Sequence, residues 1–179
     1  EWLHHLVADW QVIADLSFAD LLLVMRRGDG RYVVAEQCRP STVMTLRVDD
    51  VVGHEVDSDV ASELDEVMES TNPVKSEGLT LVGRSEVCNV YTPVRHGGRT
   101  LGVVVRQTNM ATRESNGRYE SESINAGKIL FQMIAREQFP YNNPVMSQRH
   151  VARVADGFIL VTNEGIVRYD SPNAIGCFR

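Results

Sequence analysis

The chain has 179 residues, of which 43% are hydrophobic and 23% are charged, with a net charge of −6, so it can form one domain with a full core and part of a second. The acidic balance and the scattered Lys and Arg residues argue against direct nucleic-acid binding, because phosphate contacts need clustered basic side chains. No apolar run reaches the length of a bilayer span and no segment resembles a signal peptide, so we expect a cytoplasmic protein without membrane contact.

The N-terminal region is predicted to form a helix, a β-hairpin and a short strand. Apolar residues recur every three or four positions in residues 1–16, which predicts an amphipathic helix that packs on its own sheet or on a partner helix. Strands are expected at residues 21–26 and 32–37, joined by a glycine-containing turn. Residues 43–48 are expected to form a further short strand.

A second amphipathic helix is expected to begin at Asp57 or Ser58, either of which can cap it, and to run to about Ser70. Its outer face carries a row of acidic residues. We interpret this row as a solvated surface, because a carboxylate cation site needs oxygen ligands from several directions. Residues 71–79 are expected to form a loop that leads to the next hairpin.

Residues 89–108, NVYTPVRHGGRTLGVVVRQT, give the strongest strand signal. The two arms are rich in β-branched and aromatic residues, and the turn contains Gly97 and Gly98, which can take the positive φ that tight hairpins require. We therefore expect a central β-hairpin. Pro93 has no amide proton, so it should lie at a bulge or on the unbonded side of the ladder.

The longest helix is expected at residues 119–138, after a polar connection at residues 111–118. The proline at position 140 should end it. Its apolar stripe is wide and needs two packing partners, which we expect to be the sheet and either the N-terminal helix or another subunit. The stripe consists of Ile124, Ala126, Ile129, Leu130, Phe131, Met133 and Ile134.

After an expected linker at residues 146–154, a second unit begins. Residues 155–162 and 166–169 predict the two arms of a hairpin around a turn at residues 163–165. Residues 171–174 can start a helix. One hairpin and the start of a helix cannot bury a core, so we expect this unit to be incomplete.

Several short motifs lie in order along the chain: Asp9-Trp10-Gln11, Ala14-Asp15-Leu16-Ser17-Phe18-Ala19-Asp20, Gln37-Cys38-Arg39-Pro40, Pro93-Val94-Arg95, Asp156-Gly157-Phe158 and Ser171-Pro172-Asn173-Ala174. With the order of elements, they resemble a GAF domain followed by the start of a PAS domain, as in the sensor region of actinobacterial cytosolic histidine kinases of the PdtaS type. The resemblance implies an α+β fold. It places a GAF domain, with a central antiparallel sheet flanked by helices, at residues 1–140, a linker at 141–154 and an incomplete PAS domain at 155–179.

The same resemblance implies a function in two-component signal transduction. Such kinases detect a signal in the GAF and PAS module and regulate autophosphorylation and phosphotransfer to a response regulator, in this family one with an RNA-binding antiterminator output. Their kinase domain uses ATP and Mg²⁺ and follows an H-R-x-K-N-N phosphoacceptor box. The sequence contains neither the kinase domain nor the phosphoacceptor box, and His150 lacks the Lys-Asn-Asn that would mark the phosphoacceptor. We therefore expect no catalytic residue, cofactor site or metal site in this chain.

A GAF domain that binds a ligand should hold a pocket of several hundred Å³ between the sheet and residues 38–79. The candidate pocket residues, taken from strand ends and polar side chains, are Tyr32, Cys38, Arg39, Cys88 and Tyr91. The expected direct partners of the chain are a small-molecule ligand of this pocket and a second copy of the chain.

Two other functions stay open on the sequence. A GAF-like free methionine sulfoxide reductase would use Cys38 and Cys88, and its chemistry needs an accessible thiol of low pKa and a second thiol within reach. A ligand-free dimerisation or relay module would have a filled core where the pocket is expected. Turnover of methionine sulfoxide with a thiol reductant would favour the first, and a packed core would favour the second.

Overall fold

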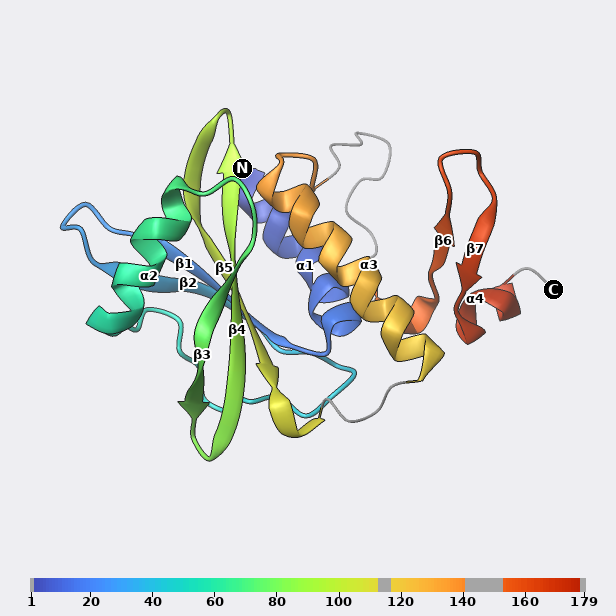
Figure 1. Ribbon diagram of the computed structural model, residues 1–179, viewed down its shortest axis with the longest axis horizontal. Coiled ribbons are helices and arrows are strands. Elements are labelled where there is room, and N and C mark those ends of the chain that lie inside the picture. Colours follow the sequence, from blue (N-terminus) through green and yellow to red (C-terminus); the bar gives the residue numbers. More distant parts are fainter. Residues whose placement is uncertain (1, 113–116, 141–152, 178–179) are drawn as a thin grey trace.

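The computed structural model describes residues 2–112, 117–140 and 153–177. Five antiparallel strands form one sheet in the order β2-β1-β5-β4-β3, with α1 and α3 on one face and α2 on the other (Figure 1). The elements are α1 (Trp2–Ser17), β1 (Asp20–Arg26), β2 (Tyr32–Cys38), α2 (Ser58–Glu69), β3 (Val74–Val82), β4 (Ser85–His96), β5 (Arg99–Asn109), η1 (Met110–Thr112), α3 (Arg118–Ala135), η2 (Val154–Asp156), β6 (Ile159–Val161), β7 (Val167–Asp170) and α4 (Pro172–Cys177).

The expected central hairpin is confirmed. Strand β4 pairs with β5 from Val87 to His96, along the whole of β5, and β5 lies in the middle of the sheet. Gly97 and Gly98 have φ values of 61° and 73°, which gives the two-residue turn that matches the twist of the strands. Pro93 pairs with Val103 of β5, and it lies beyond Tyr91, where the pairing of β4 with β3 ends. Its missing amide proton therefore breaks no bond to β3. The register of β4 and β5 shifts just after it, between Val94 and Arg95.

Helix α1 packs on its own sheet, as one of the two sequence interpretations expected. Leu6 and Ile13 are fully buried in a core that also contains Phe131 of α3. At the start of the helix, the ring of Trp2 stacks on His96 with a centroid separation of 4.6 Å. The apolar stripe of α1 is therefore covered by the sheet and by α3 within one chain.

Three sequence expectations are wrong. Residues 43–48 form no strand, and the Leu46 amide in this segment is bonded to the buried carboxylate of Asp20 in place of a strand ladder. Most of residues 71–79 is not a loop but the first part of β3, an edge strand that is exposed at most of its positions while its backbone pairs with β4. Helix α3 ends at Ala135 and not at residue 138, because Glu137 takes a left-handed φ of 61°. Its Ile129, which was expected in the packed apolar stripe, is 51% exposed.

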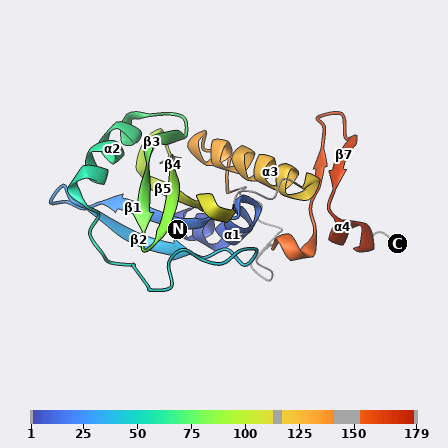
Figure 2. The ribbon, with the colours of Figure 1, turned by 60° about the horizontal axis from the view of Figure 1, so that its bottom comes forward.

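The predicted second hairpin is present as β6 and β7. It lies beside the N-terminal end of α3, away from the five-stranded sheet (Figures 1 and 2). A small cluster of Leu16, Ala126 and Val154 joins it to α1 and α3. Most of the expected linker at 146–154 and half of the polar connection at 111–118 lie outside the described residues. Within the described part of the chain, no helix is long and apolar enough to cross a bilayer.

Gly102 on β5 provides a test of how tightly the middle of the sheet is packed. A Cβ atom at this position would lie 2.6 Å from the carbonyl oxygen of Val24, so Gly102→Ala should force the two strands apart and lower the free energy of unfolding by about 1–3 kcal/mol. The matched control is Gly78→Ala on the edge strand, where a Cβ would meet nothing within 4 Å. Urea unfolding of both variants measures the difference, and equal stabilities would contradict the packing described here.

Candidate functional site

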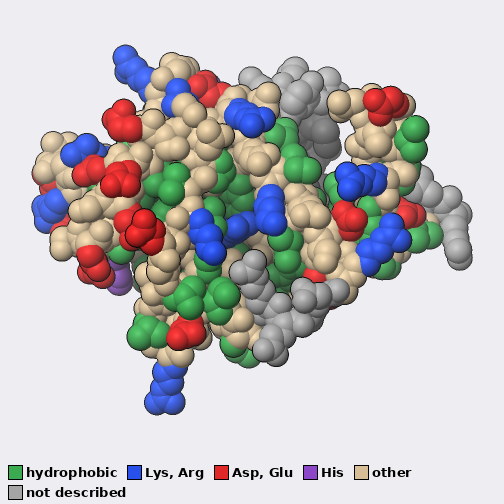
Figure 3. All heavy atoms as spheres, viewed as in Figure 1, with side chains coloured by type: hydrophobic (Ala, Val, Ile, Leu, Met, Phe, Trp, Pro, Cys, Tyr) green, Lys and Arg blue, Asp and Glu red, His purple; other side chains and the backbone are tan. Residues whose placement is uncertain are grey.

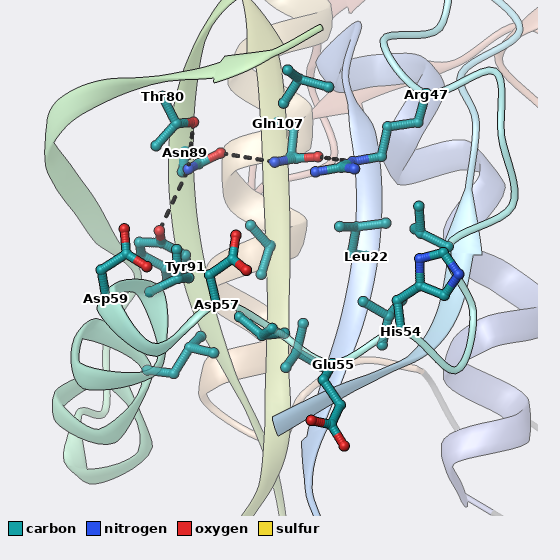
Figure 4. A pocket seen from close by; sticks show the side chains of 18 of the residues that line it. Leu22, Arg47, His54, Glu55, Asp57, Asp59, Thr80, Asn89, Tyr91 and Gln107 are labelled. Atoms are coloured by element: carbon teal, nitrogen blue, oxygen red, sulfur yellow. Dashed lines mark hydrogen bonds between the residues drawn. The ribbon is translucent and has the colours of Figure 1, made fainter. Parts of the chain in front are cut away.

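A cavity of about 490 Å³ lies between the sheet, α2 and the loop that precedes α2. This size is within the range of small-molecule sites. Much of its wall is apolar, and these side chains come from strands β1, β2 and β5 and from α2. They include Leu22, Val24, Val34, Val105, Val60 and Leu64. Figure 4 shows the cavity with its polar side chains at the margins of this apolar surface.

A row of hydrogen-bonded polar side chains crosses one end of the cavity (Figure 4). Asn89 Nδ2 donates to Thr80 Oγ1 at 3.1 Å and to the Tyr91 hydroxyl at 3.4 Å. Gln107 Nε2 donates to Asn89 Oδ1 at 3.2 Å, and Arg47 Nε donates to Gln107 Oε1 at 2.6 Å. Asn89 and Gln107 are both buried, so the row satisfies their amides and fixes the direction of the Arg47 guanidinium.

Burial changes the acidity of two members of this row. It lowers the pKa of Arg47, and the charge of Asp20 acts in the opposite direction. An arginine remains a cation nonetheless, because its ordinary pKa is far above neutrality. Burial also raises the pKa of Tyr91 to about 12, with further contributions from its hydrogen bond to Glu63 and from the Glu63 charge. Tyr91 is therefore a neutral hydroxyl at physiological pH.

The α2 end of the cavity is acidic. Asp57 and Asp59 line it at the start of the helix, and Figure 3 shows further acidic side chains gathered over α2. Glu55 also belongs to the lining, but its carboxylate pairs with Arg31 at 2.6 Å and with Arg27 at 3.5 Å. Asp57 and Asp59 are therefore the lining carboxylates that form no ion pair with a Lys or Arg in the described part of the chain.

The segment that brings Arg47 to the cavity is held by two buried aspartates. Asp15, at the end of α1, accepts hydrogen bonds from the Ser41 amide at 2.7 Å and from the Ser41 hydroxyl at 2.9 Å. Asp20, at the start of β1, accepts from the Leu46 amide at 2.8 Å and from the Thr45 hydroxyl. Each aspartate is at most 1% exposed. Charge-assisted bonds to backbone amides take the place of a strand ladder here and fix the loop from residue 41 to residue 47.

Further side chains from the short motifs named in the sequence analysis hold the same loop. The Arg39 guanidinium donates to the carbonyl groups of Arg47, Val48 and Asp49 at 2.8–3.1 Å. Gln11 of α1 donates to the Arg39 carbonyl at 3.0 Å. Residues that were recognisable only as short motifs thus act together as the support of one wall of the cavity.

Of the five pocket residues predicted from the sequence, one lines the cavity and four do not. Tyr91 lines the cavity, whereas Tyr32, Cys38, Arg39 and Cys88 are not part of its lining. Tyr32 packs in the core under α2 and donates to Asp65 at 2.7 Å. Cys38 lies in the core on the other face of the sheet, under α1 and α3.

The sequence analysis missed Arg47, Asn89 and Gln107. The signal for two of them was present, because Asn89 and Gln107 are amides inside strongly apolar strands, where a polar side chain needs a partner. Their pairing depends on the register of β4 and β5, which places Asn89 opposite Gln107. Arg47 carried no such signal, since it lies in a loop that was expected to be a strand.

A five-stranded antiparallel sheet with helices on both faces and a cavity under one of them is the architecture of a GAF-type sensory domain. Comparisons with known proteins agree. The family model "Histidine kinase PdtaS, GAF domain" matches residues 1–126. The chain belongs to this family of GAF domains.

Individual relatives have the same description. The sensor histidine kinase PdtaS of Mycobacterium tuberculosis (strain CDC 1551 / Oshkosh) is 35% identical over 183 residues, and that of Mycolicibacterium smegmatis (strain ATCC 700084 / mc(2)155) is 33% identical over 182. Each match covers 98% of this chain and 36% of the relative, so the chain spans little more than a third of their length. A solved structure described as the sensor region of a sensor histidine kinase has a TM-score of 0.81 at 32% identity, over 99% of this chain and 61% of that one.

The two buried aspartates give a stability prediction. Asp15→Asn replaces an acceptor carboxylate by an amide whose NH₂ group cannot accept from Ser41, so it should lower the free energy of unfolding by about 1.5–3 kcal/mol. Hydrogen exchange of the amides in residues 41–47 should rise with it. Asp49→Asn, an exposed change in the same loop, should stay within about 0.5 kcal/mol of the wild type. An unchanged stability and exchange rate in Asp15→Asn would refute the role of this carboxylate.

Cys38 gives a prediction about thiol reactivity. Burial, together with the charges of Asp15 and Asp20, raises the pKa of its thiol to about 12. The thiolate is the reactive form, so iodoacetamide at pH 8 should modify Cys38 in the folded chain far more slowly than in urea. Peptide mass spectrometry measures the modified fraction. Equal rates in the folded and unfolded chain would show that the thiol is accessible and ionised.

Proposed function

We propose that this chain is the sensor region of a two-component histidine kinase and that its cavity binds a small-molecule signal. Membership of the PdtaS-type GAF family carries this proposal, together with the 490 Å³ cavity between α2 and the sheet. A relay that binds nothing would have a filled core at this place. The open cavity therefore favours ligand sensing over a purely mechanical role.

In the whole protein, a kinase domain would use ATP and Mg²⁺ to transfer the γ-phosphoryl group to one of its own histidines, with ADP as the product. The phosphoryl group would then pass to a response regulator, for which an RNA-binding antiterminator is our specific proposal. The role of the chain in this scheme is regulation of the transfer and not the transfer itself.

The reductase alternative lacks support in the structure. Cys38 is on β2 and Cys88 is on β4, and two further strands, β1 and β5, separate them. Both thiols are buried and neither lines the cavity. The raised pKa of Cys38 also works against a thiolate nucleophile.

The proposal includes a physical route from the cavity to the C-terminal hairpin. Arg47 lines the cavity, and its loop is bonded to Asp15 and Asp20, which lie on either side of the end of α1. Between them, Phe18 takes a left-handed φ of 48° and turns the chain from the helix into the sheet. A ligand that moves the Arg47 loop would therefore act on the end of α1.

Aromatic contacts continue from that point. Phe18 meets Tyr119 of α3 with ring centroids 6.4 Å apart, and Tyr119 meets Phe158 at 6.2 Å. Phe158 meets Tyr169 of β7 at 5.4 Å, and the Arg118 guanidinium lies 5.6 Å from the Tyr169 ring centroid. For such a contact chain to carry a signal, the ligand must bind one arrangement of it better than another.

The test uses the full gene product that contains this chain, incubated with ATP and Mg²⁺ and then with a response regulator. We expect a phosphohistidine, and we expect Tyr119→Ala to change the rate of its formation at least about fivefold, as a typical coupling free energy would. Lys128→Ala, an exposed change on the same helix, should leave the rate unaltered.

Phosphate transfer is followed with radiolabelled ATP and acid-labile phosphate analysis. Absence of a phosphohistidine would sink the proposed function. A normal rate in Tyr119→Ala would leave the kinase assignment intact but remove the aromatic contacts from the route.

A further inference from the structure

The cavity has two charged ends, and they select a class of ligand. At one end, the Arg47 guanidinium is directed by its 2.6 Å bond to Gln107, which uses only the Nε–H group. An arginine has five N–H donors, and no other described residue forms a hydrogen bond with the remaining ones. The end of the guanidinium is thus available for an acceptor, and a carboxylate suits its planar pair of donors.

The opposite end offers negative charge. Asp57 and Asp59 line it, and no Lys or Arg in the described ranges forms an ion pair with either carboxylate. Tyr91 is the member of the polar row that lies by Asp59 (Figure 4), and the charges of Glu63 and Asp59 both raise its pKa, as expected from the acidic surroundings. An ammonium group would compensate it, and the aromatic ring of Tyr91 adds a surface that suits a cation.

Figure 4 shows Arg47 on one side of the drawn pocket, with Leu22 beside it, and Asp57 and Asp59 on the other side, by Tyr91. From this arrangement we infer that the cavity binds a small zwitterion whose ammonium group and carboxylate are separated by an apolar body, as in a dipeptide or an ω-amino acid. The ammonium group lies against Asp57 and Asp59, the carboxylate lies against Arg47, and the body covers Leu22 and Val105. The inference rests on the proposed function, since it names the signal for the same cavity.

Other ligand classes fit this charge distribution less well. A phosphate-bearing ligand would meet two unpaired aspartates for each arginine, because the third carboxylate in the lining, that of Glu55, is already paired with Arg27 and Arg31. A purely apolar ligand would remove water from Arg47 and the aspartates without replacing its hydrogen bonds, which costs free energy. An α-amino acid carries both charges on one carbon, so it matches two charged groups on different sides of the cavity less well than a ligand whose charges are separated.

The first experiment measures binding to this chain by calorimetry and by the shift in its melting temperature. The probes are glycyl-leucine, leucyl-glycine, 5-aminovalerate and 6-aminohexanoate, and leucine is the control with adjacent charges. We expect at least one of the four to bind at least about tenfold more tightly than leucine. For a dipeptide that binds, the N-acetyl and the C-terminal amide derivatives should each lose at least about tenfold in affinity. For an ω-amino acid that binds, two controls of equal chain length each lack one charged group: the simple alkylamine and the simple carboxylic acid. Each of them should also bind at least about tenfold more weakly.

The second experiment removes one charged end at a time in the protein. Arg47→Gln should weaken the binding of the selected zwitterion at least about tenfold, and so should the double change Asp57→Asn with Asp59→Asn. Glu66→Gln, an exposed acidic residue of α2 outside the cavity lining, is the matched control and should bind as the wild type does. Circular dichroism checks that each variant is folded, and the ligand derivatives provide the same test without a mutation should one of them unfold.

Some outcomes would overturn the inference. If none of the four probes binds, or if acetylated and amidated forms bind as well as the parent dipeptide, the zwitterion assignment is wrong. If inorganic phosphate or AMP binds and Arg47→Gln abolishes it, the cavity selects anions. In each of these cases the sensor function is untouched, because it is judged by phosphohistidine formation in the full gene product. Conversely, a zwitterion that binds to a protein without kinase activity would leave this inference standing and remove the proposed function.

Discussion

The structure depends on two carboxylates that are removed from water and bonded to backbone amides. Asp15 and Asp20 lie five residues apart, at the end of α1 and the start of β1, and between them they hold the segment from residue 41 to residue 47. A buried carboxylate is costly unless its oxygens accept several hydrogen bonds, so the loop and the aspartates stabilise each other. No strand ladder is formed in this segment, so these carboxylates and the Arg39 guanidinium supply the hydrogen bonds that fix it.

That interaction also supports the cavity on the α2 face of the sheet. The loop places Arg47 against Gln107, and the amide row of Gln107 and Asn89 then extends across two strands to Thr80. Every buried amide in the row has a partner, so polar groups surround the cavity without the penalty of unsatisfied bonds. On the other face, α1 and α3 close over a core that contains Leu6, Ile13 and Phe131.

The sequence predicted those parts of the fold whose information is local. Alternating strands, two glycines with positive φ and helical stripes were sufficient for the central hairpin, for α1 and for the C-terminal hairpin. The errors fall where distant residues decide. Residues 43–48 have strand-like composition, but the Leu46 amide is bonded to Asp20, 26 positions away, and residues 74–79 were expected to be loop but pair with β4 as part of β3. For the same reason only Tyr91 among the five expected pocket residues was found in the cavity: face and register, and not residue type, decide what lines it.

Strand β1 has a consequence of its own for how such a domain can change. Leu21 and Leu23 belong to the core under α1 and α3, whereas Leu22 and Val24 line the cavity under α2. Only the backbone of the strand therefore separates the packed face of the sheet from the face with the cavity. A single inserted or deleted residue in this strand would exchange the two environments for every side chain after it. The lining of the cavity can thus change by substitution at alternate positions of β1, while the length of the strand is under a much stricter constraint.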